Sequence, residues 1–526
     1  MIAFLKRCWQ RRWIRGLAWT AITLVTLLTL FTAWVNWKGA HVWSEAQQRL
    51  RDERLSLDFH QTMQESVPEA ENFCATPLLR DLMLVVDDDA SKGEPAAKRK
   101  AVEALGLPDA KKSPSGLERP SLQRKPDEDA AKYMADWAKW LRDVQVAMPV
   151  TDAENPAREV LAALSYQDAA VAEMARMLDR PRAQFLPSPK DREIPEMFFS
   201  LQVPHYGALQ KASGGLALRA LAAAASGEAA KAHETTRIMA RLSEAIGQEP
   251  FLIGLLVGRA NAVQTTHVVW TLCQTHAGSA EDFRKLQGDL ERLDFYDAVL
   301  HAWQGELAAG VNAVLYLKRT RDSSLLSIIR TEPGESRSSG GDFIVRLLPT
   351  GWFDMNAANM VHMELDYIIR PLRDQGWQAV MNLQGDMERD LKNAKAHWST
   401  NLDKIFPMLI MPSAVNVTGL VVYGQCLVNQ AIIACALEQY YVEHQSYPET
   451  LAALKQTNGK ALPVDPASEA PMKYRKTEDG RYKLWSVGID LVDDGGKEGD
   501  KDAKGDAAKP NKAGYKGDWV WEYAGG

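Results

Sequence analysis

The chain has 526 residues, of which 46% are hydrophobic and 25% are charged, a composition typical of globular proteins. This length allows about three or four domains and a large buried core without disulfide bonds, and the composition excludes collagen-like, purely coiled-coil and fully disordered chains. The net charge is −6, but the first fifteen residues carry five basic residues and no acid. The remainder has 57 basic and 68 acidic residues, a charge of −11, which argues against a nucleic-acid-binding body.

An uncharged apolar stretch follows this basic start. Residues 16–37 carry no charge, and as a helix they span about 33 Å, enough to cross the hydrocarbon of a bilayer. The positive-inside rule then predicts a cytoplasmic basic tail over 1–15, a transmembrane anchor over 16–37 and an exported body. A cleaved signal peptide is the alternative, but no Ala-x-Ala site follows the stretch.

Five cysteines are distributed along the chain. The expected topology leaves Cys8 in the cytoplasm and Cys74, Cys273, Cys426 and Cys435 outside, where three complete pairings are open. Cys426 and Cys435 are nine residues apart in a stretch with a helical pattern, so they fall on opposite helix faces and are not expected to pair with each other.

Two regions of different character follow the anchor. Residues 38–86 are interpreted as a juxtamembrane helical region, since Trp43, Leu50 and Leu57 recur at intervals of seven. Residues 87–128 are rich in charge and proline and poor in large apolar side chains. Such a segment buries too little surface to offset the entropy lost on ordering, so a mobile insertion is expected. A charged docking segment is the alternative.

Residues 129–412 are expected to form an α-helical domain. Helices are predicted over 209–225 and 229–246, separated by a Ser-Gly-Glu break, which together form a helical hairpin. A second pair is predicted over 251–276 and 283–293, with Ser279 and Asp282 as an N-cap signal. The spacing of about 35 residues is loosely similar to that of tetratricopeptide repeats. The fold class is therefore mainly α, an array of helical hairpins.

A second uncharged stretch covers residues 405–437. A second membrane span is one interpretation. The stretch contains polar amides that are costly in hydrocarbon, which favours a buried core helix instead. The amides are Asn416, Gln425, Asn429 and Gln430.

The last part of the chain, residues 413–526, has a different order of elements. A long helix is predicted to end before Tyr447-Pro448. Two alternating segments, 472–475 and 482–488, flank a Glu-Asp-Gly turn that predicts a β-hairpin. A further strand is expected at 519–521. This is a small α+β module.

The ordered motifs of this module resemble a known family. The motifs are Tyr447-Pro448, then Leu462-Pro463-x-Asp465-Pro466, then Ser486-x-Gly488-x-Asp490. They are similar to the C-terminal domain of the major pseudopilins of type II secretion, and the whole chain resembles single-span, membrane-anchored bacterial proteins that carry such a tail. The resemblance implies a bacterial inner-membrane location, with the N-terminus cytoplasmic and the body periplasmic. The prepilin-peptidase signature is missing, so assembly into a filament is not expected.

The same resemblance implies a calcium site, because related pseudopilins bind calcium in the corresponding loop. By position Asp490 and Asp518 match the family's acidic residues, and Asp493 and Asp494 lie between them. Carboxylates mixed with glycines suit the flexible oxygen coordination of Ca²⁺. A solvated acidic loop is the alternative, and no other cofactor is expected.

Signals for catalysis are weak. His233-Glu234 begins a zinc-protease string, but Arg237 stands where its second histidine belongs. His362 and Asp366 share a helix face and are interpreted as a surface ion pair. Glu306 lies in an apolar helix, where we expect it to cap or pair with a neighbour rather than to act as an acid or base.

These observations favour a membrane-anchored extracytoplasmic binding or scaffold protein, with an envelope protein as partner and without nucleic acid. One alternative is an envelope hydrolase with a scattered site. Another is a component associated with a type II secretion-like system.

Overall fold

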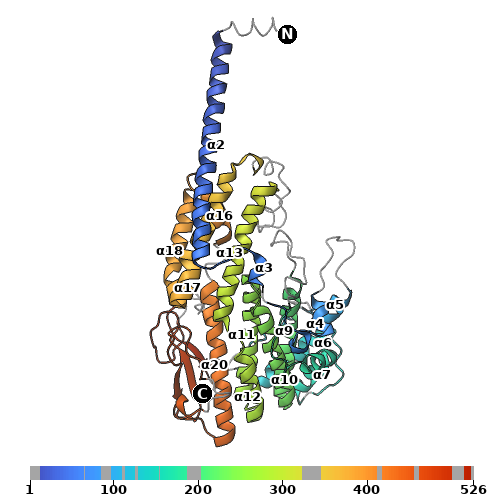
Figure 1. Ribbon diagram of the computed structural model, residues 1–526. Coiled ribbons are helices and arrows are strands. Elements are labelled where there is room, and N and C mark those ends of the chain that lie inside the picture. Colours follow the sequence, from blue (N-terminus) through green and yellow to red (C-terminus); the bar gives the residue numbers. More distant parts are fainter. Residues whose placement is uncertain are drawn as a thin grey trace.

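The computed structural model describes residues 12–522, except for 64, 84–95, 109–112, 125–127, 153, 186–202, 323–344, 412–416, 455–460 and 500–514. The chain is mainly α-helical and carries a small three-stranded antiparallel sheet. Figure 1 shows helix α2 projecting from one end of the body and the sheet near the opposite end. Most of the predicted basic tail, residues 1–11, lies outside the described residues.

Helix α2, Arg12–Asp52, joins the predicted anchor and the juxtamembrane region in one continuous element. Most apolar side chains of its outer part, between Leu17 and Trp37, are exposed, and the helix is long and apolar enough to cross a membrane. Its inner part packs along helix α16, where Val35, Ala46 and Leu50 are buried.

Short elements follow α2 and cover one side of the body. Part of the predicted mobile insertion belongs to them, since α5 packs on α4 and α9, and Ala101 and Leu105 are buried. Gln167 Nε2 donates to Leu105 O at 2.9 Å. The predicted mobile insertion therefore contains a short packed helix, which its charged composition conceals. The elements are α3 Phe59–Thr62, η1 Glu69–Glu71, α4 Pro77–Leu82 and α5 Ala96–Glu103.

The predicted helical domain begins with three helices that end on a proline-containing connection. Asp129 and Asn155 cap the first two through their side chains, as their residue types favour. The elements are α6 Ala130–Asp143, α7 Pro156–Ala163, η2 Ser165–Gln167 and α8 Asp168–Ala175.

The helices of both predicted pairs are formed, and the first pair is a packed hairpin. Helices α9, His205–Ala225, and α10, Ala229–Gly247, turn at Gly227, whose φ of +84° suits glycine. Helices α11, Leu252–Gln274, and α12, Ala280–Leu290, follow, and Ser279 and Asp282 form a complete capping box. Helix α10 packs on both α9 and α11, whereas α12 packs on α10 and α20.

The second half of the helical body brings the chain back to α2. Helix α13 packs on α16, which continues through a π-helical turn into α17. The elements are α13 Phe295–Thr320, α16 Thr350–Glu364, η5 Leu365–Ile369, α17 Arg370–Gln375, α18 Trp377–Ala396, η6 Leu402–Lys404 and α19 Ile405–Ile410.

Helix α20, Val417–His444, is a core helix, as its amide side chains predict. It packs against α11, α12 and α13 and also contacts β2 and β3. After the turn η8, Leu451–Ala453, the strands β1 Lys473–Lys476, β2 Tyr482–Ser486 and β3 Trp519–Glu522 form a sheet of order β1-β2-β3. The register pairs Tyr474 with Leu484 and Trp485 with Val520. The β1–β2 hairpin lies where it was predicted.

Candidate functional site

The loop after β2 contains the predicted calcium ligands, and Asp518 organises it. Asp518 is fully buried and accepts hydrogen bonds from three backbone N–H groups, of Asp494 at 3.3 Å, Gly496 at 2.6 Å and Lys497 at 3.3 Å. Burial raises the pKa of this carboxyl. The loop is therefore held to the start of β3 by protein contacts.

The other predicted ligands lie around the same loop. Asp493 accepts from Trp485 Nε1 at 3.0 Å and lies 3.2 Å from Lys473 Nζ, and the indole hydrogen bond lowers the pKa of its carboxyl. Asp490 accepts from the backbone of Val492 at 3.2 Å. Within the described residues, no three His, Cys, Asp or Glu side chains converge as a metal site would require. Calcium binding stays a prediction.

Asp465 is a structural residue to which the sequence analysis gave no role. It is buried and accepts from Ser486 Oγ at 2.7 Å and from the backbone N–H of Val487 at 3.2 Å. It thereby fixes the end of β2 against the segment before β1. The only sequence feature that pointed to Asp465 was its place in the Leu-Pro-x-Asp-Pro motif.

An apolar groove of about 280 Å³ lies near Asp465, between α20, η8 and the segment that leads into β1. Val464 on its rim is 46% exposed although it is apolar. Strand β1 is an edge of the described sheet, and extended segments commonly bind along such an edge with side chains in an adjoining groove. The groove is lined by Ile433, Leu451, Ala452, Leu454, Leu462, Pro463, Val464, Pro471 and Met472.

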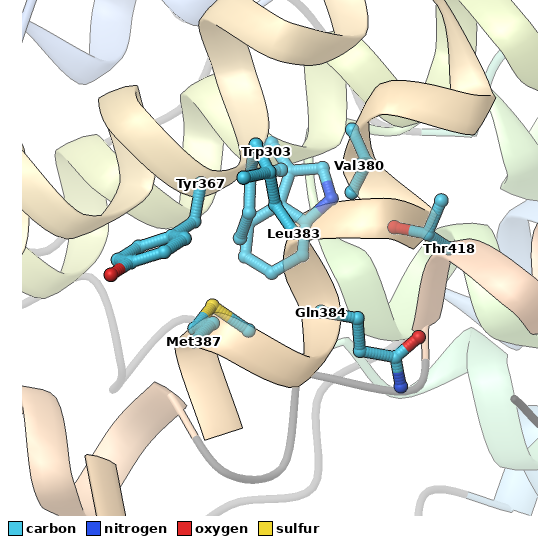
Figure 2. A pocket seen from close by; sticks show the side chains of 8 residues that line it. Trp303, Tyr367, Val380, Leu383, Gln384, Met387 and Thr418 are labelled. Carbon is cyan, nitrogen blue, oxygen red and sulfur yellow. The ribbon is translucent and has the colours of Figure 1, made fainter. Parts of the chain in front are cut away.

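A second cavity lies in the helical body, where α13, η5, α18 and α20 meet (Figure 2). Trp303, Tyr367 and Met387 surround it, with Gln384 and Thr418 on its polar side. Its volume is about 10 Å³, room for a single water molecule at most. It is too small to bind a substrate.

Buried carboxyl groups are present in the body. Glu306 accepts the backbone N–H of Leu252 at 3.1 Å and so caps helix α11, which confirms the capping role expected for it. Burial raises the pKa of Glu306 and raises that of the fully buried Glu364 well above its ordinary value. Both groups are protonated more readily than exposed glutamates, and neither lines the apolar groove or the second cavity.

Two further buried glutamates each accept from one histidine and one tyrosine. Glu249 contacts His205 Nε2 at 2.7 Å and accepts from Tyr206 OH.

Glu438 of α20 contacts His276 Nδ1 at 2.8 Å and accepts from Tyr447 OH. His276 and Glu438 are 162 residues apart, and no local pattern reveals such a pair. The Glu249 cluster and the Glu438 cluster each join segments that are distant in the sequence.

The His362–Asp366 pair has a partner that the sequence did not reveal. Arg49 of α2 lies 2.6 Å from His362 Nδ1 and donates to both carboxylate oxygens of Asp366. Both residues of the predicted ion pair therefore contact Arg49, and through it they join α2 to the body. His233 packs its ring on Phe283 and contacts Ala277 O at 2.8 Å.

The four cysteines expected outside the cytoplasm are buried and form no disulfide bond with one another in this structure. Burial raises the pKa of all four thiols, which disfavours the reactive thiolate. The residues are Cys74, Cys273, Cys426 and Cys435.

Comparison of the chain with protein-family models, curated proteins and solved structures finds no match. The geometry of the chain itself therefore carries the functional conclusion.

Proposed function

We propose that this protein is a membrane-anchored binding or scaffold protein of the bacterial envelope. In this proposal α2 crosses the inner membrane with its N-terminus in the cytoplasm, and the helical-hairpin body, loosely tetratricopeptide-like, holds a pseudopilin-like module in the periplasm. The charge-flanked apolar stretch supports the topology, and the ordered C-terminal motifs support the pseudopilin-like character of the module.

The observation that carries the proposal is the backbone contact between α2 and α16. A Cβ atom on Gly39 would lie 2.2 Å from Gly351 O, and one on Gly351 would lie 2.2 Å from Val35 O. Only glycine permits this approach. Asn36 Oδ1 also accepts from the backbone N–H of Gly351 at 2.9 Å and from Thr350 Oγ1 at 3.0 Å, which satisfies free donors at the start of α16.

Charged contacts extend this junction toward the inner end of α2. Arg49 binds His362 and Asp366, and Glu53, just beyond the helix, pairs with Arg370 at 3.0 Å and Arg373 at 2.7 Å. The glycine, amide and ionic contacts together join the apolar helix firmly to the body. Because the junction is rigid, the protein is suited to hold a binding surface at a fixed height above the membrane.

Contacts of α20 carry this rigidity to the C-terminal module. Asn429 Nδ2 donates to Val464 O at 2.8 Å, and Gln430 Nε2 donates to Trp519 O at 2.7 Å. The apolar groove is therefore presented on a fixed platform. Its shape and its neighbouring strand edge fit an extended apolar segment of another envelope protein.

Site-specific photocrosslinking in cells tests the proposal. A photoreactive amino acid at Val464, on the groove rim, is expected to crosslink to one discrete envelope protein. The same group at Val492, which is 53% exposed in the same module but does not line the groove, is the matched control. Equal crosslinking at both positions, or none at Val464 while the protein is folded and in the membrane fraction, would contradict a binding role for the groove.

The calcium prediction needs the intact chain, because α20 packs into the body and the buried side chains of β2 and β3 belong to the same core. We propose Asp490 and Asp494 as the principal ligands, since Asp518 and Asp493 already accept several protein donors. Titration of the full-length protein with calcium is expected to raise its melting temperature, and Asp490→Ala is expected to remove that rise. No heat of calcium binding, and no effect of chelator on the melting temperature, would exclude the site.

A further inference from the structure

The end of the body from which α2 emerges carries apolar side chains that no described residue covers. Leu347 is 67% exposed, Trp398 is 61% exposed and Leu402 is 43% exposed. Residues 345–352 and 396–402, which contain them, are here called the apex. Figure 1 shows that α2 leaves the body at the same end where α16 begins and α13 and α18 finish.

The contacts of Asn36 fix the height of the apex relative to α2. Asn36 binds the first residues of α16, Thr350 and Gly351, and Trp37 is the last residue of the uncharged stretch. Helix α16 therefore begins at the level where the proposed membrane span ends. The chain around it lies at the height of the bilayer surface.

Specific contacts hold the exposed apolar side chains in place. Arg321, at the end of α13, donates to Val345 O at 3.0 Å and to Leu348 O at 2.8 Å, on either side of Leu347. Its guanidinium lies 4.7 Å from the centre of the Phe353 ring.

The segment after α18 is held in a similar way. Asn356 Nδ2 of α16 donates to Leu402 O at 3.1 Å, and Asn359 Nδ2 donates to Asp403 O at 2.8 Å. These bonds fix the backbone that carries Trp398 and Leu402 while their side chains remain exposed.

Basic side chains accompany these apolar groups. Arg346 is exposed next to Leu347, and Lys392 and Lys395 are exposed on the last turns of α18. Arg319 is exposed on the last turn of α13. Indole rings with nearby lysine and arginine are typical of residues at a membrane–water interface, and cationic groups are attracted to anionic lipid headgroups.

We propose that the apex rests in the interfacial layer of the bilayer that α2 crosses, with Leu347, Trp398 and Leu402 in contact with lipid. This inference rests on the proposed membrane anchoring. It adds a second contact with the same membrane, which holds the body upright rather than leaving its orientation to α2 alone. The occupant of the apex is the lipid surface, because the apex adjoins the end of the span on the same rigid unit.

Fluorescence quenching in vesicles tests the proposal with the full-length chain. Leu347→Cys, Trp398→Cys and Val492→Cys are prepared separately in a Cys8→Ser background, whose four remaining thiols are buried, and are labelled with the fluorophore NBD. Each protein is reconstituted into vesicles of phosphatidylethanolamine and phosphatidylglycerol that contain nitroxide-bearing lipid. Probes at 347 and 398 are expected to emit at shorter wavelength than the probe at 492. They should also lose emission to nitroxides placed near the headgroup more than to nitroxides at the bilayer centre.

Three results would overturn the inference. Probes at 347 and 398 that are quenched no more than the probe at 492, in protein that resists carbonate extraction, would show an anchored body whose apex lies in water. Blue-shifted emission without quenching by lipid nitroxides would show that protein covers the apex. Extraction of the unlabelled protein by carbonate would instead contradict the membrane anchor, and with it the proposed function.

Discussion

Helices α2 and α20 are almost equal in apolar character but have opposite environments. The most apolar 18-residue window in each has a mean hydropathy of 1.7, yet 0% of that window is buried in α2 and 78% in α20. Average hydropathy therefore does not separate a helix that faces lipid from a helix that forms a protein core. Both need apolar surroundings, and only the location of those surroundings differs.

The polar residues of the two helices explain the difference. Four threonines of α2 donate to carbonyl groups four residues earlier in the same helix, as Thr26 does to Ile22 O at 2.8 Å. In α20 the amides bond to other segments: Gln425 to Leu293 O at 3.1 Å and Gln430 to Trp519 O at 2.7 Å. The hydroxyls of α2 are satisfied within their own helix, whereas Gln425 and Gln430 of α20 donate to carbonyl groups that only the folded body supplies.

The largest expected effect comes from a charge placed in each helix. Val428→Asp is expected to destabilise the body by about 4 kcal/mol or more, because Val428 is fully buried and the new carboxylate would have no partner. Leu27→Asp, on the exposed part of α2, should leave the melting temperature of the body unchanged and weaken membrane insertion by about 3 kcal/mol. Circular dichroism in detergent and membrane fractionation measure the two effects. Equal loss of melting temperature in both variants would contradict the assignment.

The junction of α2 with α16 is expected to be the next most sensitive feature. Gly39→Leu would force a side chain into the backbone of Gly351, so the helices must separate, at a cost of ~3 kcal/mol. The first turn of α16 should then exchange its amide hydrogens faster. Gly16→Leu is the control, since no atom lies within 4 Å of its added Cβ. Unchanged exchange in Gly39→Leu would contradict the close packing.

Removal of a polar side chain is expected to have different effects on stability in α20 and in α2. Gln430→Leu leaves Trp519 O without its side-chain donor, and we expect a loss of about 2 kcal/mol in the free energy of unfolding. Thr26→Val removes only a bond within its own helix and is expected to change nothing measurable. Chemical denaturation of both variants beside the wild-type protein gives the comparison, and a neutral Gln430→Leu would show that α20 does not depend on that contact.

One contribution to the stability of the body, that of His267, is expected to be lost in acid. Burial lowers the pKa of His267 on α11 from 6.5 to about 4, so the unfolded state binds a proton at a higher pH than the folded state does. The contribution of His267 to the free energy of unfolding is therefore complete above pH 6.5 and is lost as the pH falls toward 4. We expect ~1–2 kcal/mol, less than the full shift implies because the ring is not fully shielded from water. His267→Gln should flatten this part of the pH–stability profile, and an unchanged profile would exclude His267 as the cause.

Local signals predicted much of the fold. The glycine break at Gly227, the Ser279–Asp282 capping box and the β1–β2 turn each lie within a few residues of the element that they define. The contacts that join elements were not predictable, because their partners lie far apart in the sequence. Asn36 contacts Gly351, 315 residues away, and neither residue forms a recognisable motif alone.

The candidate site divides in the same way. The aspartates of the C-terminal loop were identified from their order in the chain, but the structure shows Asp518 occupied by backbone donors. The sequence did not predict the apolar groove or the apex, because an exposed apolar residue such as Val464 or Trp398 cannot be distinguished from a core residue in a sequence. The packed α5 was missed for the opposite reason, since its charges conceal the buried Ala101.

The most direct test of a body joined rigidly to the apolar helix is a distance measurement across their junction. Nitroxide spin labels at Leu30→Cys, on the exposed part of α2, and at Lys392→Cys, on α18, are introduced into the full-length chain with Cys8→Ser and measured by double electron–electron resonance in lipid nanodiscs. We predict one narrow distance distribution, which Gly39→Leu broadens. A broad distribution in the otherwise unchanged protein would show that the body swings freely on its anchor and would contradict the account.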